Sequence, residues 1–127
     1  MRKIYDCFTY FNESDLLDLR INELKDFDVT HILIESPYTH TNQKKELNYK
    51  NSSKKYENLI CFSAENMPNN GNPWDNENSQ RNYIKEALLT LNLKDEDLVI
   101  ISDLDEIPNL SNFPFNEVEN YVYSFCM

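Results

Sequence analysis

The 127-residue sequence has little glycine, few basic residues and no long apolar run. Its one glycine, Gly71, excludes the glycine-rich phosphate loops of Walker-type nucleotide hydrolases and the dinucleotide-binding fingerprint. Lys and Arg total 12 against 22 Asp and Glu, and the net charge of -10 argues against nonspecific binding to nucleic acid or to an anionic membrane. A bound phosphate group would therefore have to be held in another way.

No apolar run reaches the roughly 20 residues that a membrane span requires, and the first residues have a strand-like pattern instead of that of a signal peptide. We therefore predict a cytoplasmic chain without a membrane span. The three cysteines, Cys7, Cys61 and Cys126, are widely spaced in apolar or aromatic stretches and form no CxxC pair. Because free cysteine is commonly buried, we expect all three to be reduced core residues.

The apolar pattern alternates between the periods of strands and helices, which is typical of an α/β domain. Hydrophobic residues make up 40% of the chain, enough for the core of one compact domain or of half a larger one. The segments with a strand pattern are residues 3–11, 29–35, 58–64 and 97–102.

Helices and connections are predicted between these strands. Residues 15–25 carry one apolar stripe, and residues 12–14 can cap that helix. Ser79 can cap a second helix, whereas residues 41–56 predict an irregular helix or a surface crossover. Residues 65–78 form a turn-rich loop long enough to suggest function. This order of elements predicts a mostly parallel sheet flanked by helices.

The most informative motif is Asp103-Leu104-Asp105-Glu106, which directly follows the apolar run of residues 98–102. Where a buried strand gives way to a loop, alternate carboxylates can converge on one hard cation and on a phosphate that the cation bridges. Ligands of open α/β sheets collect at the carboxyl ends of the strands. Polar clusters follow all four predicted strands, at Tyr10-Phe11-Asn12-Glu13, Glu35-Ser36, Glu65, and Asp103-Leu104-Asp105-Glu106.

An ordered series of motifs resembles glycosyltransferase family 17, whose named member is a β-1,4-mannosyl-glycoprotein 4-β-N-acetylglucosaminyltransferase. The resemblance covers nearly the whole chain and is strongest in the second half. Its first blocks are Ile4-Tyr5-Asp6-Cys7-Phe8, Phe11-Asn12-Glu13, Asp15-Leu16-Leu17 with Arg20, Asn22-Glu23-Leu24, Glu35 with Thr39-His40-Thr41, and Met67-Pro68. Its later blocks are Trp74 with Glu77, Gln80-Arg81-Asn82, and residues 100–108 around the DxD motif.

The resemblance implies a Rossmann-like fold of the GT-A type that binds a nucleotide-sugar donor, UDP-N-acetylglucosamine in this family, for transfer to a glycan acceptor such as an N-glycan. Asp103 and Asp105 would hold a divalent metal, Mn²⁺ or Mg²⁺, against the diphosphate. Arg81 could add a charge-assisted contact to phosphate from the first turn of its helix. The donor-binding residues implied in this way are Tyr10, Phe11, Asn12, Glu13, Glu35, Arg81, Asp103 and Asp105.

The sequence departs from the family pattern after the DxD motif. Family members continue with a half that binds the acceptor and supplies the base that deprotonates the attacking hydroxyl. Glu117 and Glu119 precede an aromatic strand pattern and do not replace that base. We therefore expect residues 1–127 to be a single glycosyltransferase-like domain truncated after the motif, with its catalytic residues unassigned.

Several alternatives accompany these assignments. The DxD motif could instead supply a phosphatase nucleophile or a calcium loop, but the first needs more downstream residues and Pro108 stands where the second needs glycine. Asn12 is as well suited to capping a helix, Arg81 to a surface salt bridge and the acidic motif to capping nearby amides. A catalytically incomplete nucleotide-sugar-binding or protein-interaction module is also compatible, pairing with a partner chain or itself through the edge at residues 121–127.

Overall fold

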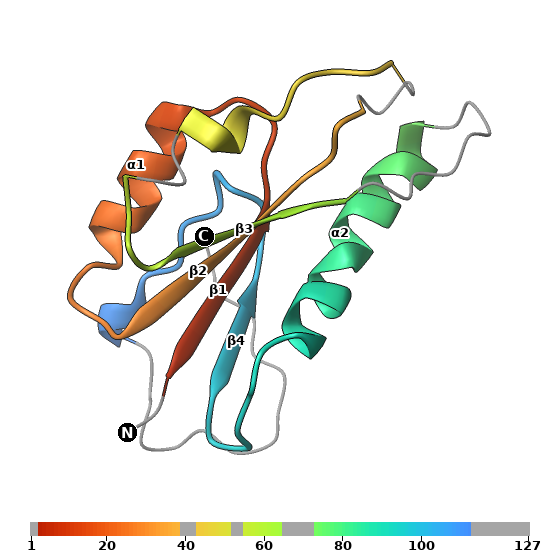
Figure 1. Cartoon of the computed structure of the whole chain (residues 1–127). Helices are drawn as coiled ribbons and strands as arrows, with labels where there is room; N and C mark the ends of the chain where they lie inside the picture. Colours follow the sequence, from red (N-terminus) through yellow and green to blue (C-terminus); the bar gives the residue numbers. More distant parts are fainter. Residues whose placement is uncertain (1–2, 39–42, 52–54, 65–72, 113–127) are drawn as a thin grey trace.

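The computed structural model describes residues 3–38, 43–51, 55–64 and 73–112, and it forms an α/β fold around a four-stranded sheet (Figure 1). All strand pairs are parallel, in the order β3-β2-β1-β4. The prediction of a Rossmann-like α/β fold is therefore confirmed. Along the chain the elements are β1 (Ile4–Thr9), α1 (Ser14–Glu23), β2 (Val29–Glu35), η1 (Asn48–Asn51), β3 (Leu59–Ser63), α2 (Pro73–Leu89), β4 (Leu98–Ile101) and η2 (Leu110–Asn112).

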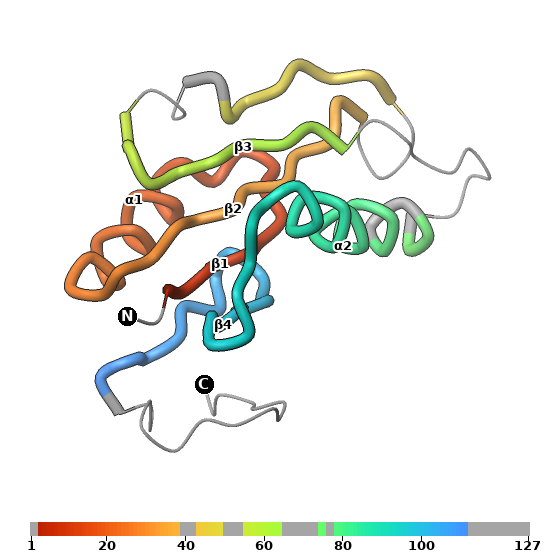
Figure 2. The backbone as a smooth tube through the Cα atoms, turned by 60° about the horizontal axis from the view of Figure 1, so that its bottom comes forward, coloured from red at the N-terminus to blue at the C-terminus, as the bar shows by residue number. Residues whose placement is uncertain are grey.

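The two long helices cover opposite faces of the sheet, as Figures 1 and 2 show from two directions. Successive side chains of a strand point to opposite faces, so β1 sends Phe8 toward α1 and Cys7 toward α2. The core on the α1 face is formed by Phe8, Tyr10, Leu17, Ile21, Leu33, Leu59 and Leu104. The core on the α2 face is formed by Tyr5, Cys7, Ile32, Ile34, Ala64, Ile84 and Ala87.

Strand β4 lies at one edge of the described sheet, beside β1. On its outer part Val99 is 40% exposed and Ile101 is 58% exposed, although both belong to the apolar run that predicted a buried strand. The central strands β1 and β2 are buried almost throughout because each has a neighbour on both sides. The predicted aromatic edge at residues 121–127 lies outside the described residues.

The second helix begins earlier than predicted. Helix α2 starts at Pro73, so Ser79 lies inside it and is not its cap. Proline suits the first helical position, because an N–H there would have no partner within the helix. The sequence predicted a turn-rich loop over residues 65–78, but residues 73–78 are helical. Residues 65–72 lie outside the described residues. Arg81 consequently lies well inside α2, and the expectation that it occupies the first turn is wrong.

The connection after β2 contains one short 3-10 helix, η1, within the stretch predicted as an irregular helix or crossover. At the start of α1 the N-cap residue is Glu13, within the predicted capping segment, but its side chain makes no capping hydrogen bond. Glu13 Oε2 instead accepts a hydrogen bond of 3.4 Å from the backbone N–H of Phe11. None of the helices in the described ranges is long and apolar enough to cross a membrane.

Candidate functional site

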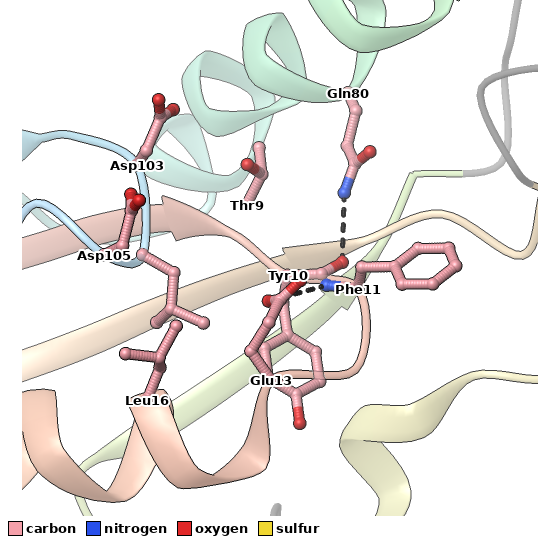
Figure 3. A pocket seen from close by; sticks show the side chains of 9 residues that line it. Thr9, Tyr10, Phe11, Glu13, Leu16, Gln80, Asp103 and Asp105 are labelled. Atoms are coloured by element: carbon pink, nitrogen blue, oxygen red, sulfur yellow. Dashed lines mark hydrogen bonds between the residues drawn. The ribbon is translucent and has the colours of Figure 1, made fainter.

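A pocket of about 270 Å³ opens where β1 and β4 end at the carboxyl edge of the sheet (Figure 3). Its walls come from the end of β1, the segment that joins β1 to α1, the first turn of α1, the helix α2, and the turn after β4. This is the edge at which ligands of open α/β sheets bind. The residues that line the pocket are Thr9, Tyr10, Phe11, Glu13, Leu16, Gln80, Asp103, Leu104 and Asp105.

The turn after β4, residues 103–106, carries the two aspartates of the DxD motif. The N–H of Glu106 donates to the carbonyl of Asp103 over 2.9 Å, and Glu106 Oε1 accepts from the N–H of Asp103 over 3.0 Å. Ser102 Oγ also donates to the carbonyl of Glu106 over 3.1 Å. Glu106 thus stabilises the turn itself, whereas the carboxylates of Asp103 and Asp105 lie together at one side of the pocket (Figure 3).

The opposite side of the pocket in the same view is aromatic (Figure 3). Phe11 is 49% exposed, and Lys45 Nζ lies 5.0 Å from the centroid of its ring. Gln80 Nε2 donates to the carbonyls of Tyr10, over 3.2 Å, and Ile34, over 3.0 Å. This buried side chain therefore attaches α2 to the carboxyl ends of β1 and β2 and fixes the back wall of the pocket.

Arg81 reaches the acidic turn from α2. Its Nη2 donates to Asp103 Oδ1 over 2.7 Å, and the side chains are 44% and 50% exposed. The salt-bridge alternative for Arg81 is therefore present in the structure. Exposed pairs of this kind contribute little to stability, so opening this pair costs little free energy.

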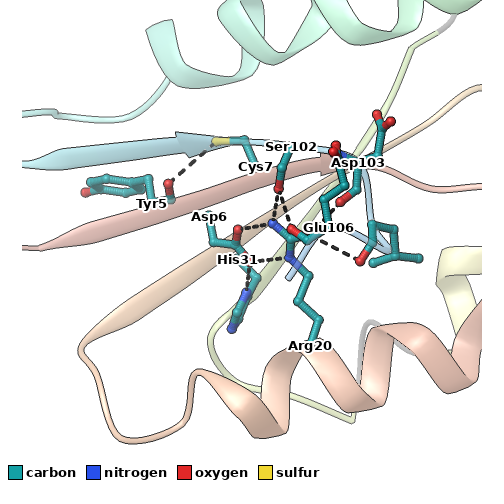
Figure 4. Close-up of polar contacts among 9 residues, drawn as sticks. Tyr5, Asp6, Cys7, Arg20, His31, Ser102, Asp103 and Glu106 are labelled. Atoms are coloured by element: carbon teal, nitrogen blue, oxygen red, sulfur yellow. Dashed lines mark hydrogen bonds and ion pairs between the residues drawn. The ribbon is translucent and has the colours of Figure 1, made fainter. Parts of the chain in front are cut away.

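A second Arg–Asp pair is buried between α1 and the sheet (Figure 4). Arg20 Nε donates to Asp6 Oδ2 over 2.9 Å, and Nη2 donates to Asp6 Oδ1 over 2.5 Å. His31 Nδ1 lies 2.7 Å from the same carboxylate, and the three residues have essentially no solvent exposure. His31 therefore has a polar role, as a buried partner of Asp6.

Burial and pairing act against each other on the ionisable groups here. Burial works to raise the pKa of Asp6, but hydrogen bonds and charge attraction from Arg20 and His31 lower it below its usual value of 3.8. Burial raises the pKa of Cys7 to about 12 and that of Cys61 to about 11. Both carry free thiols, with Cys7 buried and Cys61 partly buried, and Cys126 lies outside the described residues.

The pocket unites five of the eight residues expected to bind the donor, namely Tyr10, Phe11, Glu13, Asp103 and Asp105. Arg81 does not line the pocket, and its guanidinium contacts the lining residue Asp103. Asn12 is exposed and does not line the pocket. Glu35 is fully buried and does not line the pocket. Its carboxylate accepts a hydrogen bond from Lys45 Nζ and one from each of the backbone N–H groups of Asn48 and Tyr49, both over 2.7 Å. The observed role of Glu35 is thus to hold the start of η1.

Four lining residues did not follow from the sequence: Thr9, Leu16, Gln80 and Leu104. Three of them nevertheless stand in the motif blocks: Leu16 in Asp15-Leu16-Leu17, Gln80 in Gln80-Arg81-Asn82 and Leu104 in the acidic motif. Their positions in these blocks were the signal, although the two leucines also looked like ordinary apolar positions of a helix and a turn. The blocks at residues 39–41 and 67–68 lie outside the described residues.

The carboxylate oxygens at the acidic turn suit a hard divalent cation that also binds the phosphates of a substrate. Across the described ranges, no three His, Cys, Asp or Glu side chains gather closely enough to hold a metal ion by themselves. Asp103 and Asp105 offer two carboxylates at one side of the pocket. Mg²⁺ and similar ions are commonly bound by one or two carboxylates together with substrate phosphates, so the pair fits that arrangement.

Comparison with known protein families supplies the remaining evidence. The model of glycosyltransferase family 17 matches residues 1–126. Searches of curated proteins and of solved structures find no significant match. The family match spans nearly the whole sequence and includes every element around the pocket and the acidic turn after β4. The chain therefore belongs to glycosyltransferase family 17.

Proposed function

We propose that the pocket binds a nucleotide-sugar donor, UDP-N-acetylglucosamine, together with a divalent cation, as the donor half of a GT-A-type transferase acting on glycans. The observation that carries this proposal is the placement of Asp103 and Asp105 at one side of a pocket that has an aromatic ring on its other side. Family membership supports sugar transfer as the reaction, while the donor, the metal and an N-glycan acceptor belong to the proposal.

The charge of the pocket supports a cation. Its described lining contains three carboxylates, Glu13, Asp103 and Asp105, and none of the lining residues is Lys, Arg or His. A diphosphate would be repelled by such a surface without a positive charge between them. A bound Mn²⁺ or Mg²⁺ neutralises that charge and stabilises UDP as it leaves. Arg81 can add a second positive charge by turning from Asp103 to phosphate.

The aromatic side supports a nucleobase. The half-exposed ring of Phe11 offers a face for stacking, and each base stacked on an aromatic ring contributes about 1–3 kcal/mol. The Tyr10 carbonyl is held by Gln80, so the backbone that carries Phe11 is fixed relative to α2. The proposed orientation of the donor therefore has its base beside Phe11 and its diphosphate beside the acidic turn.

The test is calorimetric titration of UDP-N-acetylglucosamine into the chain, with and without Mn²⁺. The double variant Asp103→Asn, Asp105→Asn should lose metal-dependent binding while it keeps the wild-type circular dichroism spectrum. A matched control is Asp95→Asn, Glu96→Gln, which removes the same charge from two exposed residues before β4, at the other end of the sheet. The control should bind as the wild type does.

Two outcomes would redirect the proposal. Equal binding with and without Mn²⁺ would reject the metal site, and a preference for another nucleotide sugar such as GDP-mannose would reject the donor. A folded wild-type chain that binds no nucleotide sugar would overturn the proposal in favour of a protein-interaction module.

A further inference from the structure

We infer that Arg20, buried beneath the sheet, is a positioning residue that sets the geometry of the acidic turn and thereby the affinity of its aspartates for metal and diphosphate. The inference rests on the proposed function for its ligand, but its structural basis is independent of that function. Arg20 does not line the pocket and would not touch the ligand. It acts through the backbone of residues 102–106.

The guanidinium lies between two anchors (Figure 4). On one side it grips the Asp6 carboxylate on β1 with Nε and Nη2. On the other side Nη1 donates to three carbonyls of the turn, those of Asp103 at 2.7 Å, Leu104 at 3.2 Å and Glu106 at 3.3 Å. Nη2 also donates to Ser102 Oγ over 2.6 Å. One side chain thus joins the middle of β1 to Ser102 and to three of the four residues of the turn.

Only arginine can make this set of contacts. Its five N–H donors form a rigid planar fork, whereas lysine has three donors on a single nitrogen. The guanidinium also lies 4.8 Å from the centroid of the Phe8 ring, which restricts its plane. Because the side chain is fully buried, each unpaired donor would be costly, and the turn carbonyls are held where Nη1 requires them.

The consequence concerns the direction of the two aspartate side chains. Asp103 and Asp105 flank Leu104, which is itself buried in the core under α1. Because Arg20 fixes the carbonyls of Asp103 and Leu104, the peptide groups between Asp103 and Asp105 cannot rotate freely. The backbone therefore keeps the side chains of both aspartates in a constant direction. Residues that orient metal ligands from behind in this way typically change metal affinity by 10–100-fold when they are replaced.

The decisive variant is Arg20→Lys, which retains a positive charge beside Asp6 but cannot reach the turn carbonyls at the same time. We expect the Glu106 amide, which donates to Asp103 O, to exchange its hydrogen roughly ten times faster or more, while amides of β1 and β2 keep their protection. Calorimetry with Mn²⁺ and UDP should show affinity reduced by about 10–100-fold.

The matched control is Leu24→Ala, a buried apolar change at the end of α1 whose core cluster contains no residue of the acidic turn. It should lower the unfolding temperature at least as much as Arg20→Lys does. Its Mn²⁺–UDP affinity and its Glu106 exchange should nevertheless stay within about twofold of wild type. Loss of affinity in this control would show that general destabilisation suffices, and it would overturn the inference.

The remaining outcomes separate the two proposals. A folded Arg20→Lys chain with unchanged exchange and affinity overturns the positioning role. A wild-type chain without metal-dependent UDP binding overturns the proposed function, while the exchange measurement still decides whether Arg20 holds the turn. If Arg20→Lys does not fold, Ser102→Ala removes one contact of Arg20 and one of Glu106, and faster exchange at Glu106 is then required.

Discussion

The two Arg–Asp pairs differ in almost everything except their chemistry. Arg20 and Asp6 have side-chain exposures of 0% and 0%, whereas Arg81 and Asp103 have 44% and 50%. The first pair has further partners in His31, Ser102 and the turn carbonyls. Breaking it would leave a buried charge, whereas breaking the second would return both groups to water.

The difference assigns separate tasks to the two arginines. The buried pair has to remain intact, so it suits the role of fixing the acidic turn to β1 and α1. The exposed pair can open, so it suits a residue that exchanges a carboxylate for a ligand. Both converge on Asp103, one through its carbonyl and the other through its side chain.

The strongest way to test the comparison is Arg20→Met. Removing one partner of a buried pair should lower the free energy of unfolding by about 3–5 kcal/mol, because the buried Asp6 carboxylate would lose both hydrogen bonds from Arg20 and keep only His31 beside it. Urea unfolding followed by circular dichroism measures this loss. The double variant Asp6→Leu, Arg20→Met should be more stable than Arg20→Met alone. A single variant that loses less than about 1 kcal/mol would remove the distinction between the two pairs.

The pH dependence of stability sharpens the comparison with a smaller effect. The pKa of Asp6 is below its usual value of 3.8, so its ionisation stabilises the fold fully above the unfolded pKa. That contribution is lost as the pH falls through the lowered folded pKa. The stability difference between wild type and Asp6→Asn should therefore shrink as the pH falls below 3.8, measured by urea unfolding at pH 7 to 3. A constant difference would contradict the lowered pKa.

The smallest effect on stability is expected at the exposed pair. Arg81→Gln should change the free energy of unfolding by less than about 1 kcal/mol. In calorimetry it should weaken Mn²⁺-dependent UDP binding but not the binding of Mn²⁺ alone, because Asp103 then has no competing cation. The control Lys85→Gln, an exposed change one turn further along α2, removes the same charge and should alter neither. Weaker binding of Mn²⁺ alone would indicate that Arg81 orients Asp103.

Local sequence determined the elements and the position of the acidic turn. The strand pattern of residues 29–35 placed β2 at its observed bounds, and the apolar stripe of residues 15–25 identified α1. The turn-forming residues were less informative, because Pro73 was read as part of a loop and is the first residue of α2. The truncation after the motif, the cytoplasmic location and the metal remain predictions.

Tertiary structure alone decided which polar side chains meet. Arg20 and the turn carbonyls are separated by 83 to 86 positions, and Gln80 and Ile34 by 46, so no local period could pair them. The same holds for Glu35, which we expected to bind the donor. Its carboxylate accepts hydrogen bonds from the backbone at the start of η1. Periodicity is a property of neighbours in the chain, whereas these contacts arise from the order of the parallel strands, which places β4 beside β1 and the acidic turn over Arg20.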